Sequence, residues 1–102
     1  MYVKVINANM CSQKGVHYNI NEVHKQDYFC DSAFATLEYV DPWNVSDTTF
    51  LEVIPLGPFD DMGDGHSFVG DINIIRIIPI EELIRSDDWF ARKYSSLKAM
   101  EK

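Results

Sequence analysis

The run Asp71–Ile80 constrains the fold most, because it carries six isoleucines in ten residues. β-branched side chains at this density favour an extended strand. Strict polar–apolar alternation fails inside the run, since Asn73 and Arg76 are three positions apart and cannot share a face of a regular strand. Two explanations remain open: the strand is covered on both faces, or a bulge near Ile74 and Ile75 resets its register. We expect the first, which requires neighbouring strands and a covering layer.

Other segments supply the expected neighbours of this strand. Alternation with a period of two predicts strands at Tyr2–Asn7, Val16–Ile20 and Thr49–Leu56. The short polar stretch between the first two predicts a hairpin or meander. We expect a brief additional strand at Tyr28–Cys30, preceded by a loop at Asn21–Asp27.

Two helices complete the expected fold. Ser32–Val40 begins at a capping serine and ends before Pro42, because the residue before proline is disfavoured in helical space. A longer C-terminal amphipathic helix has an apolar stripe that we expect to dock on the sheet; its members are Trp89, Phe90, Tyr94, Leu97 and Met100. The prediction is an α+β fold with a mostly antiparallel sheet of roughly four to five strands. We expect residues 1–102 to form a single domain.

Composition narrows the setting of the protein. The chain is 46% hydrophobic and 25% charged, which is typical of globular proteins. We see no apolar run near the ~18 residues that a membrane span needs and no signal-peptide pattern, so we expect a cytoplasmic protein. Cys11 and Cys30 are predicted to be free thiols, and two cysteines without a CxxC motif do not indicate zinc. We expect no metal and no cofactor.

Charge is distributed unevenly along the chain. The net charge is −7, and the span Gln26–Ile75 contains no Lys or Arg but ten acidic residues. This pattern disfavours direct nucleic-acid binding, because phosphate contact requires a basic patch. It favours a cationic protein partner, because a field of one sign steers association. Solubility alone also explains an acidic surface, and that alternative remains open.

The acidic span predicts an interaction protein. We expect it to bind and block a basic surface of a host or defence protein, for example a nucleic-acid-binding groove, with carboxylates in place of phosphates. Trp43 is either a core residue or an exposed anchor. The predicted partner-binding residues are Asp41, Trp43, Asp47, Phe59, Asp60, Asp61, Met62, Asp64 and Asp71.

Residues that could carry catalysis do not form a recognisable set. The histidines His17, His24 and His66 are scattered, and there is no GxSxG or P-loop motif. The segment that starts at Asp60 is similar to a calcium loop, but Met62 stands where the third position requires an acid. We therefore predict no catalytic residues and favour a protein that is not an enzyme.

Two further functions remain open. The order of strands and the short helix allows a reduced ADP-ribosyltransferase-like or nucleotide-binding domain, which a cleft containing Lys14, Tyr18 and Glu52 would favour. An oligomeric accessory protein is the other alternative. Its self-association face would consist of Trp89, Phe90, Tyr94 and Leu97.

Several short motifs occur in an order that resembles a small uncharacterised domain of phage and bacterial proteins. They are Cys11 with the run KGVHY at 14–18, the run CDSAFA at 30–35, FLEVIPLG, and GDGHSFVGDINIIRIIPIEEL. A glycine and a histidine of that family are Ala33 and Ala35 here, so any catalytic role of that histidine is lost. The resemblance implies a phage or mobile-element setting, with the host-cell cytoplasm as its location, and implies no particular reaction.

Overall fold

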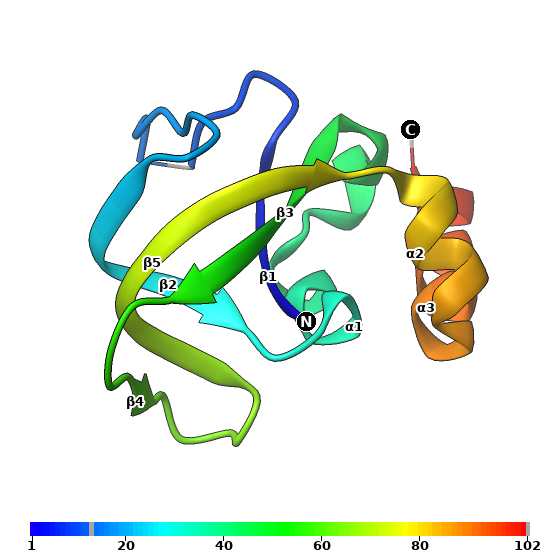
Figure 1. Cartoon of the computed structure of the whole chain (residues 1–102). Coiled ribbons are helices and arrows are strands. Elements are labelled where there is room, and N and C mark those ends of the chain that lie inside the picture. The colour runs from blue at the N-terminus through cyan, green and yellow to red at the C-terminus, as the bar shows by residue number, and fades with distance from the viewer. Residues whose placement is uncertain (13, 102) are drawn as a thin grey trace.

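The longest strand, β5, organises a small antiparallel barrel (Figure 1). A computed structural model describes residues 1–12 and 14–101. The strand order is β2-β1-β3-β5-β4, and β2 also pairs with β5, which closes the sheet. The strands are β1 (Tyr2–Asn7), β2 (Val23–Cys30), β3 (Thr48–Pro55), β4 (Asp60–Asp61) and β5 (Ser67–Ile78). The helices are α1 (Ala33–Thr36), α2 (Ile80–Ser86) and α3 (Asp88–Met100), with 3-10 turns η1 (Leu37–Tyr39) and η2 (Pro42–Asp47). The expected α+β class, with a short central helix and a longer C-terminal helix, is confirmed.

Strand β5 contains a bulge where the sequence lost its alternation. The pairing of β3 with β5 changes register between Val53–Ile74 and Glu52–Arg76, so Ile75 has no opposing residue. An extra residue in one strand reverses the faces of the residues that follow it. The expectation of a covered strand without a bulge was therefore incomplete, because β5 is both covered and bulged.

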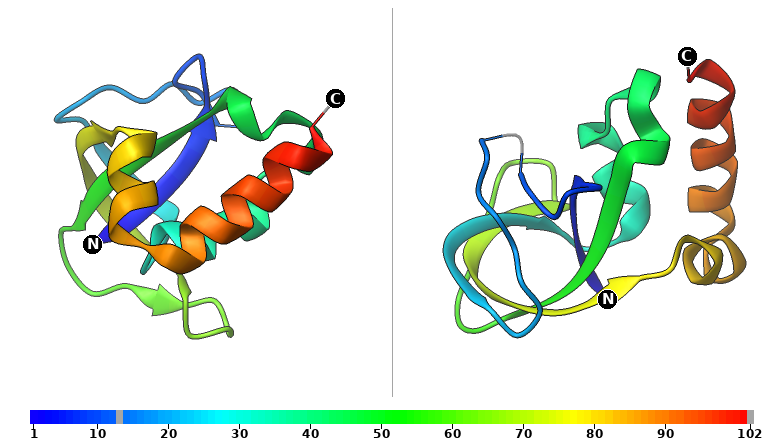
Figure 2. Two further views of the ribbon diagram at one scale, coloured as in Figure 1. Left: turned by 90° about the vertical axis from the view of Figure 1, so that its right-hand side faces the viewer. Right: turned by 90° about the horizontal axis from the view of Figure 1, so that it is seen from above.

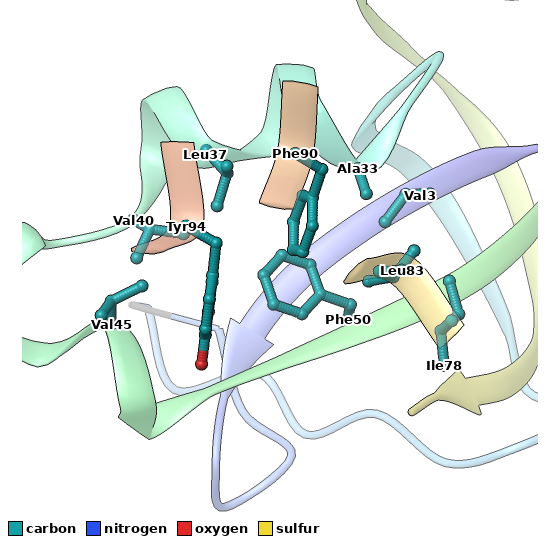
Figure 3. Close-up of a cluster of buried hydrophobic side chains, with 10 residues drawn as sticks. All are labelled: Val3, Ala33, Leu37, Val40, Val45, Phe50, Ile78, Leu83, Phe90 and Tyr94. Carbon is teal, nitrogen blue, oxygen red and sulfur yellow. The ribbon is translucent and has the colours of Figure 1, made fainter. Parts of the chain in front are cut away.

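The bulge lets one strand serve two cores. Ile72 and Ile74, before the bulge, lie inside the barrel, whereas Ile78, after it, lies against the helices. The barrel core consists of Ile6, Tyr18, Phe29, Leu51, Val53, Ile72 and Ile74. The helix-covered core consists of Val3, Ala33, Leu37, Val40, Val45, Phe50, Ile78, Leu83, Phe90 and Tyr94 (Figure 3).

Helix α3 covers the outer face of the barrel beside η2 (Figure 2, right). Asp87 caps the helix by accepting the Phe90 N–H at 3.1 Å. The Phe90 ring is fully buried and lies 5.3 Å from Phe50 and 5.6 Å from Tyr94, between ring centroids (Figure 3). The predicted apolar stripe is narrower than expected, because Trp89 is 68% exposed and Met100 is also exposed.

Two sequence expectations near the N-terminus were wrong. Residues Val16–Ile20 are not a strand, and the expected loop Asn21–Asp27 belongs largely to β2. Of the three apolar residues in the first segment only Tyr18 is buried. The expected strand Tyr28–Cys30 is the end of β2. The first part of β2 was missed because the strand is bulged: Gln26 has φ 48°, and the register shifts between His24 and Asp27.

The acidic loop is more ordered than the sequence indicated. β5 begins at Ser67 rather than at Asp71, because Asp60 and Asp61 of β4 pair with Val69 and Phe68 to form a short hairpin. None of the helices in the described part of the chain combines the length and apolar character needed to cross a bilayer.

Candidate functional site

A cleft opens between β1 and β2, where the barrel is least well paired. β1 pairs with β3 along its whole length, from Tyr2–Val53 to Asn7–Thr48. Within the described residues, β1 pairs with β2 only at Val3–Cys30. The two strands diverge beyond that pair, and a cleft of about 960 Å³ lies between them.

The cleft has a floor and two walls. Residues Val3–Asn7 of β1 form its floor, and residues His24–Cys30 of β2 form one wall. The opposite wall comes from α1, η1, η2 and the start of β3; its residues are Thr36, Glu38, Tyr39, Val40, Asp41, Asn44, Asp47 and Thr48. Since consecutive residues of β1 line the same cleft, it is the edge of that strand, rather than one face, that meets the opening.

A buried lysine spans the gap between the two strands. Lys4 Nζ donates at 2.9 Å to Asp27 Oδ1 and at 2.9 Å to the Tyr28 carbonyl oxygen. The Tyr18 hydroxyl donates to Asp27 Oδ2 at 2.6 Å. The lysine and the aspartate have side chains only 10% and 13% exposed, so each needs the other as a partner. This cluster holds β2 to β1 where the main-chain ladder stops.

The cluster shifts two pKa values. Burial by itself raises the pKa of Asp27, but the hydrogen bond from Tyr18 and the charge of Lys4 outweigh it, so that pKa lies below its usual value. Burial and the hydrogen bond to Asp27 raise the pKa of Tyr18. Asp27 is therefore a carboxylate and Tyr18 a neutral donor at neutral pH.

One of the three histidines joins this cluster. The His24 ring stacks on Tyr18 with centroids 4.2 Å apart, and its Nδ1 lies 3.9 Å from Asp27 Oδ2. Its Nε2 pairs with Glu22 Oε1. The sequence spacing alone could not indicate this, because the link between His24 and Tyr18 depends on how the loop before β2 folds.

Three exposed carboxylates line the wall opposite β2. They belong to Glu38, Asp41 and Asp47. Asp41 also accepts the Trp43 N–H at 2.9 Å, which begins η2, and Asp47 accepts from the Asn44 amide at 3.4 Å. Of the two alternatives for Trp43, exposure is the observed one, since 51% of the residue is accessible.

The β4–β5 hairpin uses two of its predicted contact residues to hold its own turn. Asp61 Oδ1 accepts the N–H groups of Gly63 at 2.6 Å and Gly65 at 3.2 Å. Asp64 accepts the N–H groups of His66 and Ser67 at 2.8 and 2.7 Å. These main-chain hydrogen bonds lower the pKa of Asp64.

Two other predicted contact residues lie away from the cleft. Asp71 accepts the Gln26 N–H at 2.9 Å and stabilises the bulge of β2. Phe59 packs in an aromatic cluster with its ring centroid 5.3 Å from Phe29 and 5.0 Å from Phe68. It anchors the hairpin to the barrel.

The fold nevertheless joins the hairpin to the acidic wall. The Tyr39 hydroxyl and Ser67 Oγ form a hydrogen bond at 2.8 Å, and Ser67 Oγ also donates to Asp64 Oδ2 at 2.9 Å. Met62 and Ser67 line the same cleft as Asp41. Tyr39 of the acidic wall and Ser67 of the hairpin therefore meet at the end of the cleft near Val3, and the wall extends from there to Asp47, beside the Asn7 end of β1.

Sequence reasoning missed several residues of this site. Tyr28 and Tyr39 are each 53% exposed and line the cleft from opposite walls, but their exposure depends on the folded arrangement. Lys4 did carry a signal: it is the one charged residue on the face of the first strand that also holds Tyr2 and Ile6. A lone base among apolar residues indicates a buried ion pair.

The structure brings together only some of the residues expected for a nucleotide-binding cleft or for a self-association face. The cleft is lined by Lys14 and Tyr18, but Glu52 is not among the described residues that line it and instead accepts from Arg76 Nε at 2.7 Å. Of the expected self-association face, Phe90 and Tyr94 are buried within the chain. Among the described residues, no three His, Cys, Asp or Glu side chains are grouped so that they could hold a metal ion.

Comparison of the chain with protein-family models, curated protein sequences and solved structures found no match. The resemblance to a phage and bacterial domain therefore rests on its quoted motifs alone. The geometry of the cleft is the remaining guide to function.

Proposed function

We propose that the protein binds a basic surface of a protein partner through the acidic wall of the cleft and the adjoining hairpin, and blocks that surface. The observation that carries the proposal is the meeting of segments 38–48 and 60–67 at one cleft. A charge pattern that is spread over the sequence thus becomes one surface that a partner could cover.

Most of the charge of this surface is not neutralised locally. The span from Gln26 to Ile75 contributes no Lys or Arg. Glu38 is paired with Lys93, at 3.7 Å between Oε1 and Nζ, but among the described residues no ion pair involves Asp41, Asp47 or Asp60. Exposed carboxylates attract a cationic partner from a distance and increase the association rate. Met62 and Trp43, which are 52% and 51% exposed, offer apolar contact area beside the charges.

The setting that we propose is the cytoplasm, and the host-cell cytoplasm if the chain is encoded by a phage. The partner would be a host or defence protein whose basic surface binds nucleic acid, so that bound carboxylates replace phosphates. The motif resemblance and the anionic surface support this setting.

The test uses the immobilised protein to capture partners from host lysate at low and high salt. We expect one or more basic proteins to bind the wild-type chain, and less to bind at ~0.5 M salt than at ~0.05 M, because salt screens exposed charges. The variant Asp41→Asn/Asp47→Asn/Asp60→Asn removes three charges from the proposed surface and should bind at least tenfold less partner.

A matched control raises the net charge by the same three units elsewhere. The double variant Glu81→Lys/Asp88→Asn changes exposed residues of α2 and α3, away from the cleft. This control should capture as much partner as the wild-type chain. Equal loss in both variants would show that only overall charge matters, and binding that is unchanged by salt would contradict the proposal.

A further inference from the structure

The cleft has the features of a site for an extended chain. Its floor is the edge of β1, whose ladder with β2 contains a single pair, Val3–Cys30, among the described residues. The Asn7 N–H donates to the Cys11 carbonyl at 2.9 Å, and the Asn7 carbonyl accepts from Met10 N–H at 3.2 Å. The polar main-chain groups of Asn7 therefore point away from β3.

The main chain of Val5 points in the same direction. Along a strand, N–H and C=O groups alternate between the two edges, so residues two apart share an edge. Val5 is two residues before Asn7 and two after Val3, which pairs with β2. No ladder pair between β1 and β2 in the described part of the chain includes Val5. Its N–H and C=O thus face the cleft.

Strand β2 does not pair regularly with Val5 across the cleft. A regular continuation of the ladder would pair Tyr28 with Val5. The Tyr28 N–H donates to Asp27 Oδ1 at 2.7 Å, and the Tyr28 carbonyl accepts from Lys4 Nζ at 2.9 Å. The positive φ of Gln26 then turns β2 away. A main-chain donor and acceptor are the usual means by which a protein edge recruits an extended peptide.

The walls of the cleft select the side chains of such a peptide. Glu38, Asp41 and Asp47 line one wall, and the half-exposed rings of Tyr28 and Tyr39 line the two sides. Carboxylates bind ammonium and guanidinium groups, and aromatic faces attract the same cations. The combination is suited to Lys and Arg side chains.

The bases of the cleft do not cancel this preference. Lys4 is paired with Asp27, and Lys25 is paired with Asp71 at 3.4 Å. Lys14 remains at the far end, on the loop that follows β1. The acidic wall is therefore the dominant charge along the edge of β1 at Val5.

We propose that the cleft takes an extended, basic segment of the partner, which pairs through its main chain with Val5 and places Lys or Arg side chains against the wall of Glu38, Asp41 and Asp47. This inference rests on the proposed function, because it specifies how the basic partner is held. Main-chain pairing supplies affinity without sequence preference, and the acidic wall supplies the preference for basic residues.

The test is a selection of displayed random octapeptides on the full wild-type chain. We expect enrichment of Lys and Arg at alternate positions, because alternate side chains of an extended peptide face the same wall. Proline should be depleted at the central positions, since it cannot donate to Val5. A selection that enriches no such pattern overturns the inference.

A second measurement separates main-chain pairing from simple charge attraction. The most enriched peptide is synthesised with single N-methyl groups at successive central amides. Methylation at the amide that donates to Val5 should weaken binding about tenfold, whereas methylation at the neighbouring amide, which points away, should not. Equal affinities for all methylated peptides would show that no strand pairing occurs.

Variants of the protein distinguish this inference from the proposed function. Glu38→Gln/Asp41→Asn/Asp47→Asn should weaken the peptide at least tenfold, and Asp60→Asn on the hairpin, which does not line the cleft in the described structure, should leave it unchanged. If the partner captured from lysate depends on Asp60 and not on the cleft residues, the inference fails while the proposed function stands. If no basic partner is captured at all, the proposed function fails.

Discussion

The two edges of β1 are closed by different chemistry. Towards β3, main-chain pairing runs the length of the strand, and the helix-covered core packs against that side of the barrel. Towards β2, one ladder pair is followed by a buried ion pair between Lys4 and Asp27. The first edge depends on packing and ladder hydrogen bonds, which do not titrate. The second depends on charge, so it should respond to pH, and it leaves room for another chain.

The largest expected effect tests the packed side. Phe90→Ala should reduce the free energy of unfolding by about 3–5 kcal/mol, because the ring is fully buried between Phe50 and Tyr94. The adjacent Trp89→Ala is the matched control and should cost less than about 1 kcal/mol, since Trp89 is largely exposed. Chemical denaturation of both variants measures the difference. Equal losses would show that α3 is not docked as described.

A smaller effect, with a different pH dependence, tests the cleft side. Lys4→Met should reduce the free energy of unfolding by about 3 kcal/mol at neutral pH, because it leaves the Asp27 carboxylate buried without its cation. Lys25→Met is the matched control, since Lys25 is exposed and its pair with Asp71 contributes at most about 1 kcal/mol.

The pH dependence follows from the lowered pKa of Asp27. A carboxyl whose pKa is lower in the folded state stabilises the fold above its unfolded value of about 3.9, and this contribution is lost as pH falls through the folded value. The loss of stability caused by Lys4→Met should therefore shrink as the pH falls below about 4 and then through the lowered pKa of Asp27 in the folded wild-type chain, where this carboxyl becomes neutral. Chemical denaturation of the wild-type chain and of Lys4→Met at pH 7 and at pH 3 measures this loss of unfolding free energy. An equal loss at both pH values would contradict the role of the Lys4–Asp27 pair. The penalty of Phe90→Ala should not shrink in this way.

The same contrast explains how much of the fold could be predicted from the sequence. The packed side follows from local patterns: the isoleucine density of β5, the alternation of β3 and the capped amphipathic helix α3 all indicate their structures. Each of these elements buries apolar side chains at the period of its own secondary structure. The α+β class could therefore be predicted from the sequence.

The cleft side could not be predicted, for physical reasons. β2 is bulged at Gln26 and mostly polar, so period-two alternation is broken where it is needed. The loop Asn21–Asp27 was expected in place of the first part of β2, and the strand Val16–Ile20 was expected where the chain forms an irregular loop. Which strand edge stays open depends on pairings between residues far apart in the chain, and a single sequence does not specify these. The sequence identified the acidic residues. It did not indicate which of them line the cleft wall, which hold the β4–β5 turn and which stabilise the bulge of β2.

The smallest expected effect concerns an exposed ion pair near the end of the cleft where β1 still pairs with β2. His66 Nδ1 lies 3.0 Å from Asp31 Oδ2, next to the Val3–Cys30 pair through the pairing of Cys30 with Ser67. The hydrogen bond with Asp31, followed by its charge, raises the pKa of His66 above the usual value. Because the folded state favours the protonated form, the stabilising contribution is complete below the unfolded pKa of about 6.5 and is lost as pH rises through the folded value.

This last pair should differ from the buried one in its sensitivity to salt. NMR titration should give a higher pKa for His66 in the wild-type chain than in Asp31→Asn, whereas Asp88→Asn, on α3, should leave that pKa unchanged. The difference should shrink on raising the salt concentration, because the imidazole is 67% exposed and its charge is screened. The buried pair of Lys4 and Asp27 is shielded from solvent ions, so the penalty of Lys4→Met should change little with salt. If His66 titrates identically in the wild-type chain and in Asp31→Asn, the two residues do not pair.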